Sequence, residues 1–161
     1  MLSRYNWTET SEGYEFSTSN KLDYLVYFTD FFLQSPVTSE DVGVYSLGIT
    51  CKQGDSFKVK RKDSLIKNTI IAIIQNFFLK NPEDAVLYIC MTDGNARQRS
   101  ITFGRWFLEL GDSQYEKYDC PEKCKKEGFY CSIIVTGRSF RKVEFINSFN
   151  YTINNYFGFN G

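Results

Sequence analysis

The spacing of apolar residues changes along the chain, and these changes predict the order of its elements. In the first third, apolar and polar positions alternate. Tyr14, Phe16 and Thr18 lie on one side, while residues 22–29 are apolar enough on both sides for an inner strand. A loop over residues 35–41 separates these strands from a third alternating stretch at 45–51. Three consecutive strands with short links predict an antiparallel meander.

The segment that follows the meander has helical spacing. Its apolar side chains recur every three or four positions, at Leu65, Thr69, Ile70, Ile73 and Phe77. We expect Asp63 to cap the first turn of this helix. We expect Asn81-Pro82 to end it, because proline has no backbone N–H to donate.

Strands and helices alternate over the rest of the chain. The pattern predicts a strand at 85–91, a helix that Gly111 ends, a strand at 129–135 and a closing helix at 145–156. Residues 111–128 are polar and charged, and we expect a long loop there. The element order predicts the α+β class: a three-stranded antiparallel meander, then helix, strand, helix, strand and helix. All strands would share one mixed sheet with helices packed on it, in a single domain over residues 1–161.

The amino-acid composition and the net charge indicate in which cellular compartment the protein lies and which kinds of partner it can bind. Nineteen basic residues balance nineteen acidic ones, so a nucleic-acid partner would have to use a local patch. The basic run at 58–62 is such a patch, although we favour a solvated linker. No stretch is apolar for long enough to span a membrane, the start lacks a signal-peptide pattern, and five cysteines form no even framework. These features predict a cytoplasmic protein with reduced thiols.

The chain contains no histidine. This excludes Ser-His-Asp and Cys-His catalysis, imidazole metal sites and proton relays through histidine. Any chemistry would have to use carboxylates, Cys, Lys or Tyr side chains.

The turn after the fourth predicted strand is the candidate site, because ligands in α/β sheets collect at strand carboxyl ends and helix N-termini. Asp93 and Arg99 are the candidate residues: a structural pair that fixes the turn, or a catalytic pair. Arg99 could also bind a phosphate or carboxylate, together with Asn95, Arg97 and Arg105. No glycine-rich phosphate loop accompanies these residues, so we favour the structural pair.

Cys120, Cys124 and Cys131 place three thiols in one stretch and raise the hypothesis of a zinc site. Paired spacing and a fourth ligand are missing, so we favour unliganded thiols and expect no cofactor. Three lysines adjoin Cys124 in the sequence, and their charge could lower its pKa and make it a redox-sensitive thiol.

About half of the chain resembles a known family. The residues that carry the likeness are Ile73-Ile74-Gln75-Asn76-Phe77-Phe78, Leu87-Tyr88-Ile89-Cys90, Asp93, Arg97-Gln98-Arg99 and Phe103-Gly104-Arg105-Trp106-Phe107, with the strand at 132–135 after them. They resemble an uncharacterised family of small bacterial proteins, mainly from Bacteroidota, described as a domain of unknown function. The resemblance implies a fold and no activity. The element order is also similar to the ribonuclease H-like fold, in which an Asp at the place of Asp93 helps to hold two metal ions. The helix at 65–79 has no Asp or Glu to complete such a site.

Two hypotheses about function follow. The first is a non-enzymatic binding or regulatory module that acts with an unknown protein partner or as a homo-oligomer. It depends on the missing histidine, metal ligands and phosphate loop. The second is a small nucleic-acid-processing enzyme, toxin-like or defence-associated, that would use Asp93 with Arg97, Arg99 or Arg105.

Overall fold

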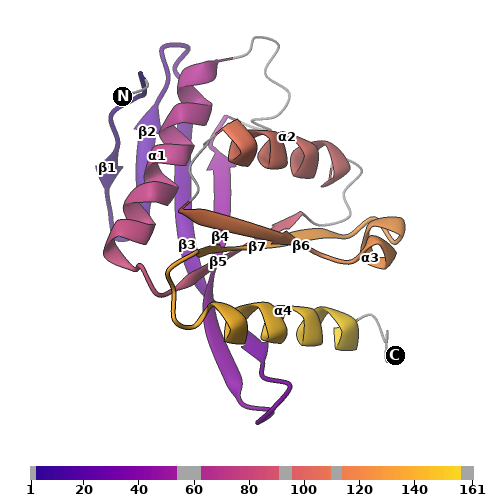
Figure 1. The fold of residues 1–161 in the computed structure, drawn as a ribbon. Coiled ribbons are helices and arrows are strands. Elements are labelled where there is room, and N and C mark those ends of the chain that lie inside the picture. The colour runs from indigo at the N-terminus through magenta and orange to yellow at the C-terminus, as the bar shows by residue number, and fades with distance from the viewer. Residues whose placement is uncertain (1–2, 54–62, 91–95, 110–113, 157–161) are drawn as a thin grey trace.

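One mixed sheet of seven strands, in the order β1-β2-β3-β4-β5-β7-β6, runs through the part of the chain that the computed structural model describes (Figure 1). The described residues are 3–53, 63–90, 96–109 and 114–156, of which 96–100 and 109 are described without their side chains. The strands are β1 (Thr8–Glu9), β2 (Tyr14–Ser17), β3 (Asp23–Gln34), β4 (Asp41–Cys51), β5 (Ala85–Cys90), β6 (Tyr115–Asp119) and β7 (Tyr130–Thr136). The predicted α+β class with one mixed sheet is confirmed.

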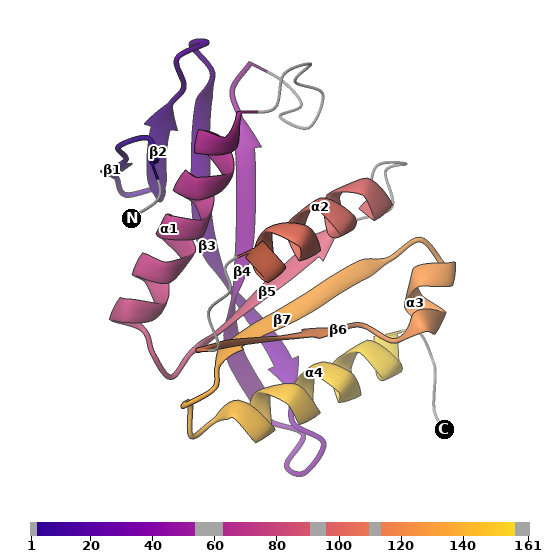
Figure 2. The ribbon, with the colours of Figure 1, turned by 45° about the horizontal axis from the view of Figure 1, so that its top comes forward.

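Helices cover both faces of this sheet. They are α1 (Ser64–Lys80), α2 (Ala96–Glu109), α3 (Glu122–Lys126) and α4 (Lys142–Tyr156). Figures 1 and 2 show α1 and α2 on one face and α4 on the other, with α3 beside the end of β6. None of these helices is both long and apolar enough to cross a lipid bilayer.

The sheet has two antiparallel halves joined by a parallel pair. The first half, β1 to β4, contains the predicted meander, and the second half consists of β5, β7 and β6. β4 and β5 lie side by side and run in the same direction, because α1 crosses over the sheet between them. The carboxyl ends of these two neighbouring strands therefore lie at the same edge of the sheet.

α1 begins and ends where its sequence predicts. Leu65 donates its backbone N–H to Asp63 Oδ1 at 2.9 Å, and the hydroxyl of Tyr5 donates to Asp63 Oδ2 at 2.6 Å. At the other end, the backbone N–H of Asn81 donates to the carbonyl of Phe77 at 2.9 Å. The N-terminal segment is thereby attached to the first turn of α1.

Each face of the sheet has its own core. Under α1 and α2 the core is largely aromatic: Phe77 stacks on Phe28 at 4.3 Å between ring centroids and meets the edge of Tyr45 at 5.1 Å. Under α4 it is largely aliphatic, with Phe145 and Phe149 fully buried against strands of both halves. Both halves of the sheet thus depend on α4 for their second face.

The long loop predicted over residues 111–128 is wrong. This stretch contains the edge strand β6 and the five-residue helix α3. β6 has the sequence YEKYD and pairs with β7 on one side only, so charged side chains are tolerated along it. The short run of alternating residues in β6 resembles the sequence of a polar loop. It is a strand only because it pairs with β7.

The core under α4 gives a direct test of the packing. Phe149→Ala should lower the free energy of unfolding by about 3–5 kcal/mol, because the buried ring leaves a cavity that the sheet cannot fill. Val143→Ala, on the same helix but 65% exposed, should change it by less than about 0.5 kcal/mol. Urea unfolding of both variants measures the difference, and equal effects would show that α4 does not pack as described.

Candidate functional site

The strongest candidate for a ligand site lies where β4 and β5 separate. Their pairing covers three residues of each strand, from Tyr45 opposite Val86 to Leu47 opposite Tyr88. Beyond Leu47, β4 remains paired with β3 alone, and beyond Tyr88, β5 remains paired with β7. Figure 2 shows the two strands diverging toward their carboxyl ends. We call residues 48–51 of β4 and 89–90 of β5 the fork.

The walls of the fork carry no charge. Its side chains are those of Ile49, Thr50, Cys51, Ile89 and Cys90, with Gly48 at the point of divergence. Ile49, Cys51 and Cys90 face the core under α1 and α2, whereas Thr50 is exposed on the other face. Between these apolar walls, the described parts of β4 and β5 are no longer paired with each other.

At the start of the fork, the ring of Tyr27 lies close to the backbone of Gly48. Tyr27 lies opposite Gly48 in the ladder, and a Cβ added to Gly48 would come within 2.1 Å of the Tyr27 ring. The ring thus covers the face of β4 that no helix covers at this point. Because glycine has no Cβ, the Tyr27 ring has room to lie against β4 at this position.

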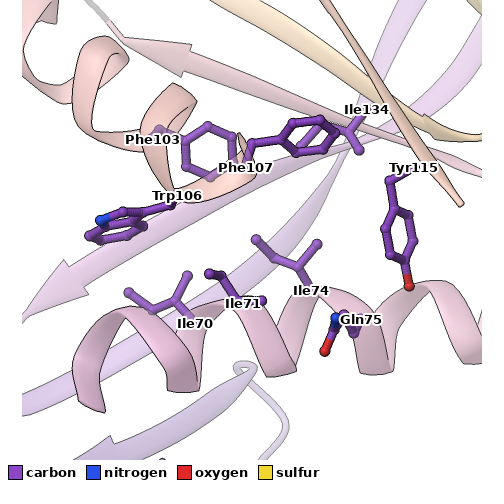
Figure 3. A pocket seen from close by; sticks show the side chains of 9 residues that line it. All are labelled: Ile70, Ile71, Ile74, Gln75, Phe103, Trp106, Phe107, Tyr115 and Ile134. Carbon is purple, nitrogen blue, oxygen red and sulfur yellow. The ribbon is translucent and has the colours of Figure 1, made fainter. Parts of the chain in front are cut away.

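A small apolar hollow lies beside the fork, between α1 and α2 (Figure 3). About 360 Å³ of space, open solvent included, lies between its side chains. Its lining contains no charged side chain: Ile70, Ile71, Ile74, Gln75, Phe103, Trp106, Phe107, Tyr115 and Ile134. Phe103 also stacks on Tyr88, the last paired residue of β5, at 4.0 Å between ring centroids. A residue that lines the hollow therefore packs on the end of the β4–β5 pairing.

Most of the residues proposed at the strand-to-helix turn cannot be placed. Asp93 and Asn95 lie outside the described residues. Arg97 and Arg99 fall in the first turn of α2, where the side chains lie outside the described residues. Arg105 is exposed on α2. α2 follows β5 in the chain as the sequence predicts, and the contact between Asp93 and Arg99 stays a prediction.

A second candidate site lies at the other end of the sheet, where Cys120, Cys124 and Cys131 form a thiol cluster. All three are buried in the core under α4, with exposed fractions of 4%, 0% and 3%. Cys120 follows β6 and lies opposite Cys131 of β7, to whose carbonyl it donates its backbone N–H at 2.9 Å. Cys124 approaches from α3. Three elements that are separate in sequence thus bring their sulfur atoms together.

The sulfur of Cys120 is the acceptor in this cluster. The backbone N–H of Cys131 donates to it at 3.5 Å, which favours the thiolate form of Cys120. The hydrogen bond from the Cys131 thiol lowers the pKa of Cys120 to about 6, with help from the charge of Lys125 and against burial and Asp119.

The prediction that Cys124 has a lowered pKa is wrong. Burial raises the pKa of Cys124 to about 11, because its side chain points into the core and not toward the neighbouring lysines. The hydrogen bond that Cys131 donates to Cys120 likewise raises the pKa of Cys131. Among the described side chains, no group of three or more Cys, Asp or Glu has the arrangement of a metal site.

Sequence analysis did not find the fork, although one signal was available. A strand, a crossing helix and a second strand, as at 45–51, 65–79 and 85–91, form the unit that places two strands in parallel. Nothing in the sequence indicates that the pairing ends after three residues.

The model of one protein family, described as a family of unknown function, matches residues 62–151. This range contains all the residues that carried the resemblance, and the likeness to a family of unknown function is confirmed. No curated protein and no solved structure is similar to the chain.

The thiolate at Cys120 gives a pH-dependent prediction. A thiolate reacts with iodoacetamide and a thiol does not, so a pKa lowered from 9.0 to about 6 should bring the alkylation rate of Cys120 to its plateau near neutral pH. Mass spectrometry of the tryptic peptide 118–123, from native protein alkylated over a pH series, measures the rate. A rate that keeps rising through pH 9.0, the ordinary value, would contradict the described hydrogen bonds.

Proposed function

The chain belongs to the family of unknown function DUF6169, and we propose that it is a non-enzymatic binding module that holds an extended, amide-bearing ligand in the fork. The observation that carries this proposal is the parallel pair at the centre of the sheet, which ends after three residues while both strands continue. In open α/β sheets, ligands bind beyond the carboxyl ends of the strands, at the point where strand order changes direction.

The chemistry of the fork favours a neutral and narrow ligand. Among the described residues, β4 and β5 are not paired with each other beyond Leu47 and Tyr88, so a narrow ligand there would lie along two strand edges. Secondary amides in an extended chain supply both a donor and an acceptor at the spacing of a strand. The uncharged walls exclude a ligand that carries its charge inside the fork.

Two kinds of ligand have this chemistry: the pantetheine arm of coenzyme A and an extended peptide. The segment that joins β4 to α1 favours the first. Residues 52–62 contain five basic side chains against one acidic side chain. In the sequence they follow β4 directly, and residues 54–62 lie outside the described residues. A ligand with a neutral arm and an anionic nucleotide matches this order of uncharged and then basic residues.

A regulatory role in the bacterial cytoplasm fits this ligand. All five cysteines are free thiols in the structure, which suits a reducing compartment. With no histidine, the chain lacks the usual general base, which favours binding over turnover. Exposed Phe32, Val37 and Phe140, with 60%, 88% and 82% of their surface accessible, support contact with a protein partner or a second copy.

Isothermal titration calorimetry with coenzyme A tests the proposal. We expect a Kd on the order of 10–100 µM for coenzyme A and weaker binding of pantetheine, which lacks the nucleotide. Lys60→Glu/Arg61→Glu should weaken coenzyme A by about tenfold and leave pantetheine unchanged. A capped tripeptide, titrated in the same way, tests the alternative ligand, an extended peptide.

A matched pair of variants locates the site. Cys51→Trp should weaken coenzyme A by about tenfold or more, because its ring would occupy the apolar side of the fork. Thr50→Trp, one residue away on the exposed face, should change binding by less than about twofold. Binding of the tripeptide without coenzyme A would overturn the choice of ligand. If the two tryptophan variants have equal effects, or if none of the probes binds, the fork is not the binding site.

A further inference from the structure

The thiol cluster is a separate site from the fork. Its three sulfur atoms lie on the α4 side of the sheet, whereas Cys51 and Cys90 face the α1 and α2 side. No metal-site arrangement includes these thiols among the described residues. What sets the cluster apart is that the sulfur of Cys120 accepts the backbone N–H of Cys131 at 3.5 Å, while two further thiols are buried beside it. This arrangement holds a nucleophile next to two thiols that can react with its oxidised form.

We propose that the cluster is a hydroperoxide-reactive dithiol in which Cys120 is the nucleophile and Cys131 closes the disulfide. In the first step, the Cys120 thiolate attacks one oxygen of the hydroperoxide, an S–O bond forms, and the O–O bond breaks. The departing hydroxide or alkoxide takes a proton from water, and Cys120 becomes a sulfenic acid. The hydroperoxide is reduced by two electrons.

In the second step, the sulfur of Cys131 attacks the sulfenic sulfur of Cys120. An S–S bond forms, the S–O bond breaks, and the hydroxyl leaves as water with the proton of the Cys131 thiol. Over both steps, two thiols lose two electrons and two protons. Hydrogen peroxide as the oxidant yields two molecules of water.

The ladder between β6 and β7 favours Cys131 over Cys124 as the second thiol. Asp119 pairs with Ser132, so Cys120 and Cys131 are the next opposed residues, and the bond from Cys120 N to Cys131 O keeps them together. Opposed residues in an antiparallel pair have Cα atoms roughly 4.5–5.5 Å apart, which is within the range of disulfides. No strand has to move for the bond to close.

The groups around the cluster support a reactive Cys120 in an otherwise closed core. Lys125 of α3 and Asp119 of β6 are the charged residues that act on it, with opposite effects. In its protonated form, the Cys120 thiol instead donates to the carbonyl of Phe129 at 3.7 Å. The sulfur is nearly inaccessible, which favours a small oxidant over a bulky disulfide.

Peptide mapping after treatment with one equivalent of hydrogen peroxide tests the proposal. Trypsin cleaves after Lys117, Lys123, Lys125 and Arg138, and so separates the three cysteines into different peptides. We expect the wild-type protein to lose two free thiols and to yield peptide 118–123 linked to the peptide that contains Cys131. This measurement needs no variant. A link to the peptide 124–125, or no link, would overturn the assigned pair.

Variants then assign the role of each thiol. Cys120→Ser should slow peroxide consumption by about tenfold or more, whereas Val143→Ala, at an exposed side chain of α4 outside the cluster, should leave it unchanged. Cys131→Ser should stop the reaction at a sulfenic acid on Cys120, detected as a dimedone adduct. Circular dichroism verifies that each variant is folded, and Cys120→Ala replaces the serine variant if that one unfolds. Wild-type consumption by a folded Cys120 variant would overturn the proposal.

Discussion

The pairing of β4 with β5 is the contact on which the arrangement of this molecule depends. It is parallel, three residues long, and the only ladder that joins the two antiparallel halves of the described sheet. Because α1 must cross from the end of β4 to the start of β5, the helix is placed over the first half, and its aromatic side chains fill that face. α4 closes the other face across both halves. The sheet is continuous because of this short ladder and the two helical layers.

The same ladder also creates the candidate ligand site. β4 is held by β3 up to Cys51, and β5 is held by β7 up to Cys90, so each strand follows its own half of a twisted sheet. Once the pairing ends at Leu47, twist carries the two strands apart. Two strand edges thereby separate at the centre of the described sheet, which is the physical basis of the proposed binding of an amide-bearing ligand.

The three clustered cysteines show how far identical side chains can differ. Cys120 accepts a hydrogen bond from the backbone N–H of Cys131 and has a lowered pKa, while Cys124 and Cys131 have raised pKa values. Sequence neighbours pointed to Cys124, since lysines surround it. Helix α3 instead points the Cys124 side chain into the core. The sulfur that accepts a hydrogen bond is that of Cys120, which no local sequence pattern distinguishes.

The sequence by itself determined the class, the order of most elements and both ends of α1, because these depend on local periodicity and on the chemistry of Asp63 and Asn81. It did not reveal β6 or α3, whose polar residues form regular structure only against β7 and the core under α4. The tertiary structure alone decided where β4 and β5 part and which sulfur accepts hydrogen bonds. Both are properties of groups distant in sequence, and their positions follow from the packing of whole elements.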